Sequence, residues 1–221
     1  MPLFCYYRFM KKGNIIVALD GVSANKALRI ARLLKGLVWG FKVNDLLFQD
    51  FKIIKKLKRY GRVFVDVKLY DIPNTVQNSV TRLSGAGADI ITIHASGGIE
   101  MMKAAKIVAG KAKIIAVMFL TSFEKISKKN FSNLINDIER AGVDGLVCSA
   151  HELKYLKNTK LLKIVPGIRP QWYQKQDDQK RTMAPKAALV AGADFLVIGR
   201  PIIESRDFHK SLVRIMDEIK L

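Results

Sequence analysis

The chain has 221 residues, 49% of them hydrophobic, and a formal net charge of +19. This length suits one α/β barrel or one to two smaller domains, and the hydrophobic content is ample for a sizeable core. The longest apolar runs, such as residues 114–120, are far shorter than a membrane-spanning helix, which argues against a membrane protein. The two cysteines, Cys5 and Cys148, do not suggest a disulfide framework and favour a reducing cytoplasm.

The high positive charge has two interpretations. It could serve an anionic partner such as nucleic acid, a membrane surface or a phosphorylated substrate, or it could be solubilising lysine on outer helix faces. Four lysines within residues 52–58 are interspersed with isoleucine and leucine, as expected for an amphipathic helix with a solvent-exposed lysine face. The other lysines are dispersed along the chain, whereas nucleic-acid binding needs a stripe of them with exposed aromatics. We therefore expect no nucleic-acid partner.

The first residues differ in character from the rest. An aromatic-rich stretch from Phe4 to Phe9 precedes Met10-Lys11-Lys12, without the order of regions typical of a signal peptide. We predict an N-terminal extension over residues 1–13 and a single catalytic domain over residues 14–221. Two interpretations of the extension stay open: Met10 is the natural start, or the segment is an arm of the folded protein.

From residue 14 onward, short apolar segments alternate with amphipathic ones. The apolar segments are rich in isoleucine, valine and phenylalanine, as buried parallel strands are. The predicted strands are Asn14–Asp20, Val38–Val43, Val63–Lys68, Asp89–His94, Lys113–Leu120, Gly145–Cys148, Leu162–Pro166 and Phe195–Gly199. The predicted helices are Ala24–Leu37, Asp45–Arg59, Thr75–Gly85, Glu100–Ala109, Phe131–Ala141, Glu152–Lys157, Ala184–Ala191 and Ile202–Ile219.

A Gly-x-Asp motif recurs before three of these strands, at residues 87–89, 142–144 and 192–194. A glycine at that place ends the preceding helix, and the recurrence indicates repeated units of one kind. Eight such units fit a (β/α)₈ TIM barrel in one domain, with an open doubly wound sheet as the alternative. A barrel places its chemistry at the carboxyl ends of the strands. The polar residues found there are Asp20, Lys42, Asp66, Lys68, His94, Thr121, Ser149, Arg169 and Arg200.

The most informative segment is residues 66–75, directly after the apolar run 63–65. Asp66 and Lys68 alternate on one strand and should share a face, while Asp71 falls in the turn before Pro73. Burying these charges without partners would be costly, so we expect them to solvate one another. A lysine held between carboxylates stays protonated and can act as a general acid. The other interpretation is a set of structural ion pairs at the barrel mouth.

A phosphate site is predicted from the last two strands. Gly199 and Arg200 follow the eighth, and Arg169, just beyond Pro166, and Gln179 follow the seventh. Loops at these places often hold phosphate, and guanidinium groups and helix N-termini suit a dianion. An arginine paired with a surface carboxylate is the alternative. The long polar segment 167–181 is interpreted as a lid over the barrel mouth or as a variable surface loop.

Other polar residues give weaker signals. Thr121 and Ser122 could bind a base edge or amide, or cap the next helix. His94 could be a base, although a hydrogen-bonded packing residue beneath the site is the favoured interpretation. The sequence has no metal-ligand spacing and no GxGxxG or Walker pattern. We therefore expect neither a metal nor a nucleotide cofactor.

Residues 66–75 resemble the signature of the orotidine 5′-phosphate decarboxylase family, Asp-x-Lys-x-x-Asp-Ile-Pro-Asn-Thr. The resemblance runs from about Asn14 to the end of the chain. Supporting segments occur in the family's order: Leu19-Asp20, Phe41-Lys42-Val43, His94-Ala95-Ser96-Gly97-Gly98, Leu120-Thr121-Ser122, Pro166-Gly167-Ile168-Arg169, Asp177-Asp178-Gln179 and Ile198-Gly199-Arg200. Asn44 stands where the family usually has glycine, so the backbone there is expected to differ.

The resemblance implies conversion of orotidine 5′-monophosphate to UMP and CO₂ without metal or organic cofactor. It assigns proton delivery to Lys68, a place against the departing carboxylate to Asp66, and completion of the charged array to Lys42 and Asp71. It further implies a homodimer in which the stretch 71–75 reaches the neighbouring subunit's site. The implied substrate-binding residues are Asp20, Lys42, Ile72, Asn74, Thr75, Thr121, Pro166, Arg169, Gln179, Gly199 and Arg200.

Two rival enzyme classes share part of the motif. Sugar-phosphate decarboxylases and hexulose-phosphate synthases of the same superfamily have the shorter Asp-x-Lys-x-x-Asp but lack the Ile-Pro-Asn-Thr continuation and the Asp-Asp-Gln segment. They are the second choice. A barrel aldolase or synthase that combines the charged triad with a divalent metal is the third.

Overall fold

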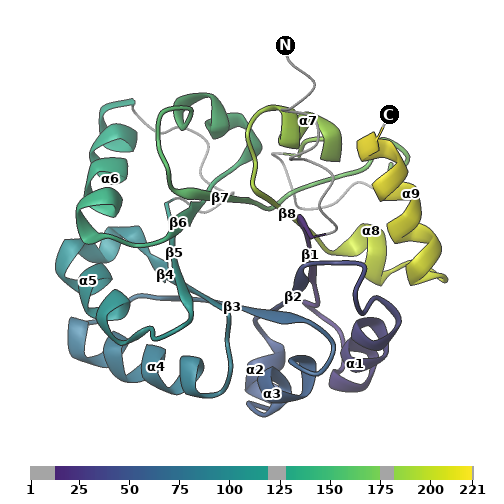
Figure 1. Cartoon of the computed structure of the whole chain (residues 1–221), viewed down its shortest axis with the longest axis horizontal. Helices are drawn as coiled ribbons and strands as arrows, with labels where there is room; N and C mark the ends of the chain where they lie inside the picture. Colours follow the sequence, from purple (N-terminus) through teal and green to yellow (C-terminus); the bar gives the residue numbers. More distant parts are fainter. Residues whose placement is uncertain (1–12, 119–127, 175–181, 221) are drawn as a thin grey trace.

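The computed structural model describes residues 13–118, 128–174 and 182–220, with the side chains of 128 and 129 excepted. Eight parallel strands form a closed barrel, in which β1 pairs with both β2 and β8 (Figure 1). The strands are β1 Ile15–Ala18, β2 Gly40–Val43, β3 Arg62–Leu69, β4 Ile90–His94, β5 Lys113–Val117, β6 Gly145–Val147, β7 Leu162–Val165 and β8 Phe195–Ile198. Closure between the first and last strands confirms the predicted (β/α)₈ TIM barrel and excludes the open sheet.

Helices surround the barrel and follow the strands in sequence (Figure 1). They are α1 Ala24–Leu33, α2 Leu46–Gln49, α3 Ile53–Leu57, α4 Pro73–Gly85, α5 Gly98–Val108, α6 Lys128–Ala141, α7 Pro185–Val190, α8 Arg200–Ile203 and α9 Phe208–Lys220. Two 3₁₀ helices, η2 Ala95–Gly97 and η3 Ala150–Tyr155, lie between them.

The core has two layers because strand side chains alternate between the two faces of the sheet. On β1, Ile16 points into the barrel, where it joins a small cluster with Phe64, Ile90 and Ile164. Its neighbour Val17 belongs instead to the larger cluster between strands and helices. The filled interior closes the barrel below its carboxyl-terminal mouth, so a ligand can enter only from the mouth.

The Gly-x-Asp motif connects neighbouring strands by hydrogen bonds at the amino-terminal end of the barrel. Its glycines have φ values of 102°, 69° and 110°, which end the preceding helices in the left-handed region. Each aspartate side chain then accepts the backbone N–H of the preceding strand. The pairs are Val63 with Asp89 at 2.8 Å, Ile114 with Asp144 at 2.9 Å, and Lys163 with Asp194 at 2.8 Å. The recurrence is thus a structural device, placed away from the mouth.

Two predicted helices are broken in the structure, which corrects their boundaries. The segment 45–59 splits into α2 and α3 at Asp50, which ends α2 with an extended backbone and whose carboxylate accepts the N–H of Lys52 at 2.8 Å. The segment 202–219 splits into α8 and α9, and Asp207 accepts the N–H of Lys210 at 3.0 Å. The segment 152–157 lies mainly in the 3₁₀ helix η3, not in an α-helix.

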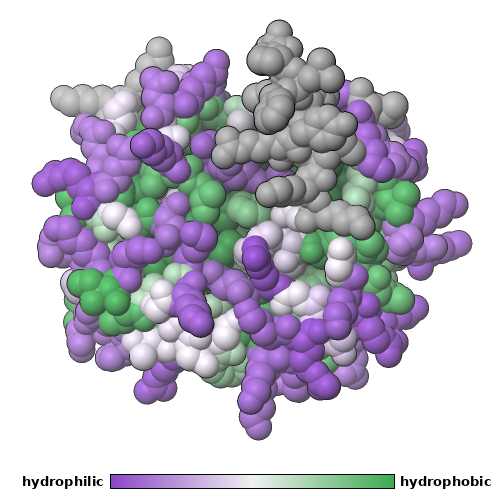
Figure 2. Space-filling view, viewed as in Figure 1, coloured by the Kyte–Doolittle hydropathy of each residue, from purple (hydrophilic) through white to green (hydrophobic). Residues whose placement is uncertain are grey.

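Figure 2 shows hydrophilic side chains on the left, lower and right sides of this face, mixed with hydrophobic ones. This distribution matches the interpretation of the lysines as a solvated outer layer. Within the described ranges, no helix combines the length and the apolarity that crossing a bilayer requires. The predicted extension over residues 1–13 lies, apart from residue 13, outside the described residues.

Candidate active site

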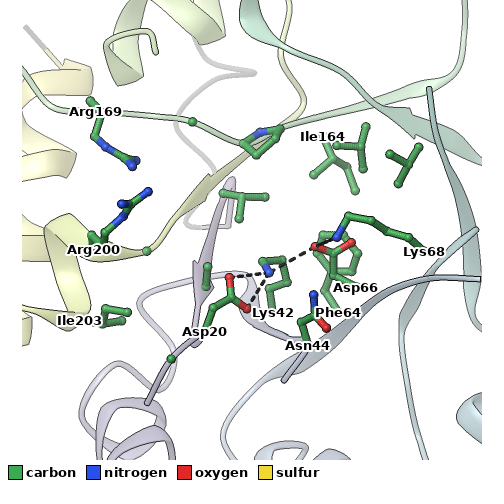
Figure 3. Close-up of a pocket in the computed structure, with 18 residues that line it drawn as sticks. Asp20, Lys42, Asn44, Phe64, Asp66, Lys68, Ile164, Arg169, Arg200 and Ile203 are labelled. Atoms are coloured by element: carbon green, nitrogen blue, oxygen red, sulfur yellow. Dashed lines mark hydrogen bonds and ion pairs between the residues drawn. The ribbon is translucent and has the colours of Figure 1, made fainter. Parts of the chain in front are cut away.

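A cavity of about 480 Å³ opens at the carboxyl ends of the strands (Figure 3). Its polar lining comes from β2 and β3 themselves and from residues just after β1, β2, β7 and β8. These polar residues are Asp20, Lys42, Asn44, Asp66, Lys68, Arg169 and Arg200. Gly21, Pro166, Gly167 and Gly199 also line the cavity. One site thus collects residues from both ends of the sequence.

Four of these side chains form a continuous row of alternating charge. The Lys42 ammonium lies 2.8 and 2.7 Å from the two carboxylate oxygens of Asp20 and 3.2 Å from Oδ2 of Asp66. The Lys68 ammonium lies 2.9 Å from the same Oδ2. Figure 3 shows the row Asp20–Lys42–Asp66–Lys68 crossing one side of the cavity. Each charge therefore has an opposite charge beside it, as the sequence predicted.

Burial and pairing act against each other on the two inner members of the row. Burial lowers the pKa of Lys42, but the charges of Asp66 and Asp20 outweigh it and hold that pKa above the ordinary 10.5. Burial raises the pKa of Asp66, but Lys42 and Lys68 outweigh it and hold that pKa below the ordinary 3.8. Lys42 therefore stabilises the fold fully below about pH 10.5, and loses this contribution only as pH rises through its raised pKa. Asp66 stabilises it above pH 3.8, and loses this contribution as pH falls through its lowered pKa.

The outer members of the row are more accessible. The side chain of Lys68 is 32% exposed and that of Asp20 is 47% exposed, against 8% for Lys42. Because Asp20 and Lys68 both line the cavity, their exposed surfaces face the space that a ligand would occupy. Lys68 is consequently the ammonium best placed to touch a reacting atom.

A bulge in β3 creates this arrangement, and the sequence did not reveal it. Val65 pairs with Ile91 and Leu69 pairs with Ile93, so four steps along β3 match two along β4. Lys68 has a φ of 50°, which among the described residues is the only positive φ outside glycine. Such a conformation costs on the order of 1–3 kcal/mol. The predicted simple alternation of Asp66 and Lys68 along a regular strand is therefore wrong, although their side chains do meet.

The backbone at Asn44 is ordinary. Asn44 lines the cavity and its φ is not positive, so asparagine fits there without left-handed strain. The departure from the family's glycine therefore changes the lining of the cavity, since it adds a carboxamide beside the charged row (Figure 3).

The opposite side of the cavity is positively charged. Arg169 and Arg200 project toward one another there, away from the row of four (Figure 3). Arg200 is the first residue of α8, directly after Gly199. Arg169 is fixed through its backbone, since its N–H donates to the carbonyl of Met183 at 3.0 Å. Two guanidinium groups that face one space favour a dianion between them.

The first part of the predicted lid is anchored to the barrel. The N–H of Gln171 donates to the carboxylate of Glu218 on α9 at 3.3 and 3.2 Å. The ring of Trp172 lies 4.5 Å from the guanidinium of Arg214, also on α9. The ring of Tyr173 lies 5.7 Å from the guanidinium of Arg169. These contacts concern residues 171–173 of the predicted lid, and residues 175–181 lie outside the described residues.

Some predicted site residues are not brought to this cavity. Asp71, Ile72, Asn74 and Thr75 are exposed and do not line it, and Asp71 instead accepts the N–H of Ile72 at 2.7 Å. The expected place of Asp71 in the charged array is thus not filled within one chain. Thr121 and Gln179 lie outside the described residues.

Two other polar candidates stand beside the site instead of in it. The Nδ1 atom of His94 accepts the N–H of Ser96 at 3.3 Å, and its ring centroid lies 5.5 Å from that of Tyr70. This supports the packing interpretation over the base. Burial, with the charge of Lys68, lowers the pKa of His94. Ser149 begins the 3₁₀ helix η3, where its N–H donates to Glu152 at 2.8 Å.

Sequence reasoning missed two groups of residues. The first is the apolar wall of the cavity, formed by Phe64, Val117, Val147, Ile164 and Val197. Each of these side chains faces the barrel interior, and all except Phe64 lie near the carboxyl end of their strand. The alternation of side chains along the strands could have predicted this wall. The second is Thr92 on β4, which lies under the charged row and had no signal beyond its polarity in an apolar strand. Within the described residues no cluster of His, Cys, Asp or Glu suited to a metal ion occurs.

Comparisons with known proteins place this chain among proteins of similar sequence and fold. The family model for the orotidine 5′-phosphate decarboxylase / HUMPS family matches residues 13–215. Orotidine 5′-phosphate decarboxylases of Carboxydothermus hydrogenoformans and Dichelobacter nodosus are 39% and 38% identical, over 94% of this chain and 96% and 99% of theirs. The crystal structure of orotidine 5′-phosphate decarboxylase from Lactobacillus acidophilus has a TM-score of 0.78 and 30% identity, and the match covers 94% of this chain and 99% of that one.

Proposed function

Because the chain belongs to the orotidine 5′-phosphate decarboxylase / HUMPS family, we propose that it converts orotidine 5′-monophosphate to UMP and CO₂ in pyrimidine biosynthesis. The enzyme would be a carbon–carbon lyase that uses its own side chains. The observation that carries this proposal is the Lys68 ammonium, which lines the cavity and lies 2.9 Å from Asp66. The relatives compared above are named as decarboxylases, which favours this reaction over the sugar-phosphate decarboxylase or hexulose-phosphate synthase alternative.

The charged row suits the difficult step of the reaction. Loss of CO₂ leaves a carbanion-like centre at C6 of the pyrimidine, in a ring that delocalises the charge poorly. A fixed ammonium at that carbon stabilises the charge without reorganisation and then supplies the proton. Lys68 takes this role, and Lys42 keeps Asp66 ionised beside it. Asp66 in turn lies against the substrate carboxylate, where like-charge repulsion favours its departure.

The rest of the substrate is assigned to the other parts of the cavity. Asp20 and Lys42 contact the ribose hydroxyls, and Thr121 approaches the pyrimidine. Arg169 and Arg200 hold the phosphate, with Gly199, Pro166 and Gln179 beside it. The phosphate is remote from the reacting carbon, so its binding energy serves to orient the ring and close the site.

The direct test is an assay on the purified protein. Orotidine 5′-monophosphate is added in the presence of a chelator, and the ultraviolet change of the pyrimidine is followed. Steady turnover to UMP is expected, because no proposed step uses a metal. No turnover, either with the chelator or with an added divalent cation, would overturn the proposal and favour the sugar-phosphate decarboxylase, synthase or aldolase classes.

The phosphate assignment makes a separate prediction. Arg200→Ala is expected to lower kcat/KM by about 10- to 100-fold, since one charge-assisted contact to the dianion disappears. Arg140→Ala is the matched control, because Arg140 is an exposed arginine on α6 whose guanidinium lies 4.0 Å from Asp137. Steady-state kinetics on both variants decide the matter. An unchanged kcat/KM for Arg200→Ala would remove the phosphate assignment.

We further propose that the protein is a homodimer with shared active sites. Tyr70 and Ile72 are 65% and 66% exposed, although both are large apolar residues next to the mouth. Between them, Asp71 does not line the cavity of its own chain. A second copy that covers this stretch would bury the apolar pair and bring Asp71, with Ile72, Asn74 and Thr75, to the partner's cavity. Three carboxylates would then face two ammonium groups and strengthen the repulsion of the substrate carboxylate.

The remaining assignments rest on composition. Residues 14–221 are proposed as the catalytic domain and residues 1–13 as an extension. A cytoplasmic location is proposed because Cys148 is a buried free thiol. No nucleic-acid partner is proposed.

A further inference from the structure

Thr92 lies directly beneath the charged row without touching the cavity. It is on β4 with an exposure of 0%, one of the few fully buried polar residues in the described part of the chain. Its Oγ1 accepts the backbone N–H of Lys68 at 2.8 Å and donates to Oδ1 of Asp66 at 3.0 Å. One hydroxyl therefore contacts the residue on each side of Val67, and both of its contacts belong to the proposed catalytic pair.

The direction of each hydrogen bond follows from chemistry. The backbone N–H of Lys68 can only donate, and the ionised carboxylate of Asp66 can only accept. The hydroxyl of Thr92 must then accept the first and donate the second, which uses its hydrogen and one lone pair. Serine and threonine have this capacity, whereas valine has the shape of threonine but neither function.

The bulge in β3 explains why such a group is needed. Thr92 stands opposite residues 66–68, in the interval where β3 has two extra residues relative to β4. Because Lys68 has a left-handed φ, its N–H is not directed at a backbone carbonyl of β4 as in a regular parallel sheet. The Thr92 hydroxyl accepts this N–H instead. The same hydroxyl holds Oδ1 of Asp66, which leaves Oδ2 for the two ammonium groups.

We propose that Thr92 is a positioning residue for the decarboxylation, which locks the bulge and fixes Asp66 and Lys68 relative to one another. The inference rests on the proposed function for its kinetic test. Its effect should fall on the chemical step, because the ammonium must meet the developing charge in a fixed geometry and small displacements there are costly. Substrate binding, which depends mainly on the distant arginines, should change little.

The test compares Thr92→Val, Thr92→Ser and Thr92→Cys. Thr92→Val is expected to lower kcat by about 10- to 100-fold with KM within about threefold, while Thr92→Ser stays within about threefold in both. Thr92→Cys, with a weak donor and acceptor, should fall between them. If Thr92→Val does not fold, the Ser and Cys variants carry the comparison. Equal kcat in all folded variants, or a serine variant as poor as the valine or cysteine one, would overturn the proposal.

A matched control exists elsewhere in the chain. The Thr159 hydroxyl donates to Glu139 at 2.7 Å and accepts the N–H of Leu161 at 3.2 Å, the same pair of bonds as Thr92 makes, outside the cavity. Thr159→Val should leave kcat unchanged, with a smaller loss of melting temperature because Thr159 is only half-buried. A kcat loss in Thr159→Val equal to that of Thr92→Val would show that general destabilisation is responsible, against the proposal.

A readout independent of turnover separates this inference from the proposed function. The pKa of His94 responds to the charge of Lys68. Displacement of Lys68 in Thr92→Val should therefore move the titration of the His94 imidazole, followed by NMR, while Thr92→Ser leaves it in place. If the wild-type protein does not decarboxylate orotidine 5′-monophosphate but these shifts occur, the proposed function fails and the positioning role stands. A His94 titration identical in Thr92→Val and wild type would contradict the positioning role.

Discussion

Lys68→Ala is expected to abolish decarboxylation, with a loss in kcat on the order of 10⁴-fold or more. The variant removes both the general acid and the cation that stabilises the carbanion, and each such function alone is worth about 10²- to 10³-fold or more. Binding of UMP should remain within about threefold, because the phosphate and ribose contacts do not involve this side chain. Steady-state kinetics and calorimetric titration with UMP measure the two effects.

Lys58→Ala provides the matched control for this variant. Lys58 is also a lysine in an ion pair with an aspartate, Asp89, but this pair lies at the amino-terminal end of the barrel. Its replacement should leave kcat unchanged. If Lys68→Ala retained turnover comparable to that of Lys58→Ala, the assignment of Lys68 as proton donor would be wrong.

The same variant has a pH-dependent signature. Burial and the charge of Lys68 together place the pKa of His94 below the ordinary 6.5. Removal of the ammonium leaves only burial, so the pKa of His94 should rise toward 6.5 without passing it, and the imidazole should take up its proton at a higher pH. In the wild type, the lowered pKa of His94 contributes to the free energy of unfolding at neutral pH, and this contribution is lost as pH falls. The contribution would be smaller in Lys68→Ala than in the wild type. NMR titration of wild type and Lys68→Ala gives the comparison.

Mixing two inactive variants is expected to restore activity if the sites are shared. Asp71→Ala should be strongly impaired, since it removes the carboxylate that each subunit gives to its partner. In a mixed dimer of Lys68→Ala and Asp71→Ala, one site carries both substitutions and the other carries neither. Random exchange of equal amounts makes half of the dimers mixed, so about one quarter of the wild-type activity should return.

The outcome of mixing distinguishes shared from separate sites. Subunits that carry two different affinity tags are first exchanged at low protein concentration, and co-purification on both tags then verifies that mixed dimers have formed. As a control, Lys68→Ala is mixed with Asp66→Asn, two residues of one chain's own row. Lys68 and Asp66 of a site come from the same chain, so each site of that mixed dimer carries one of the two substitutions and no activity should return. Absence of recovery with Asp71→Ala, despite mixed dimers, would place Asp71 outside the partner's site.

The fold was predictable because its signal is local and repeated. Most strands contain an apolar run that is buried on both faces, such as residues 114–117, and each Gly-x-Asp motif marks the end of a helix. The helix breaks at Asp50 and Asp207 were missed. In the sequence, an aspartate whose carboxylate accepts a nearby backbone N–H cannot be told from a solvent-exposed aspartate on a helix face.

The sequence by itself favoured the barrel over an open sheet, and it indicated that Asp20, Lys42, Asp66, Lys68, Arg169 and Arg200 gather at the mouth, since the carboxyl ends of parallel strands meet there. Asp71, which the sequence placed in the same group, does not line the cavity of its own chain. The sequence also indicated the partnership of Asp66 with Lys68, because unpaired charges after a buried strand are too costly to keep. Only the tertiary structure decided how they meet. The bulge, the left-handed backbone of Lys68 and the hydroxyl of Thr92 depend on the register between β3 and β4, and register is a relation between strands that no single segment encodes.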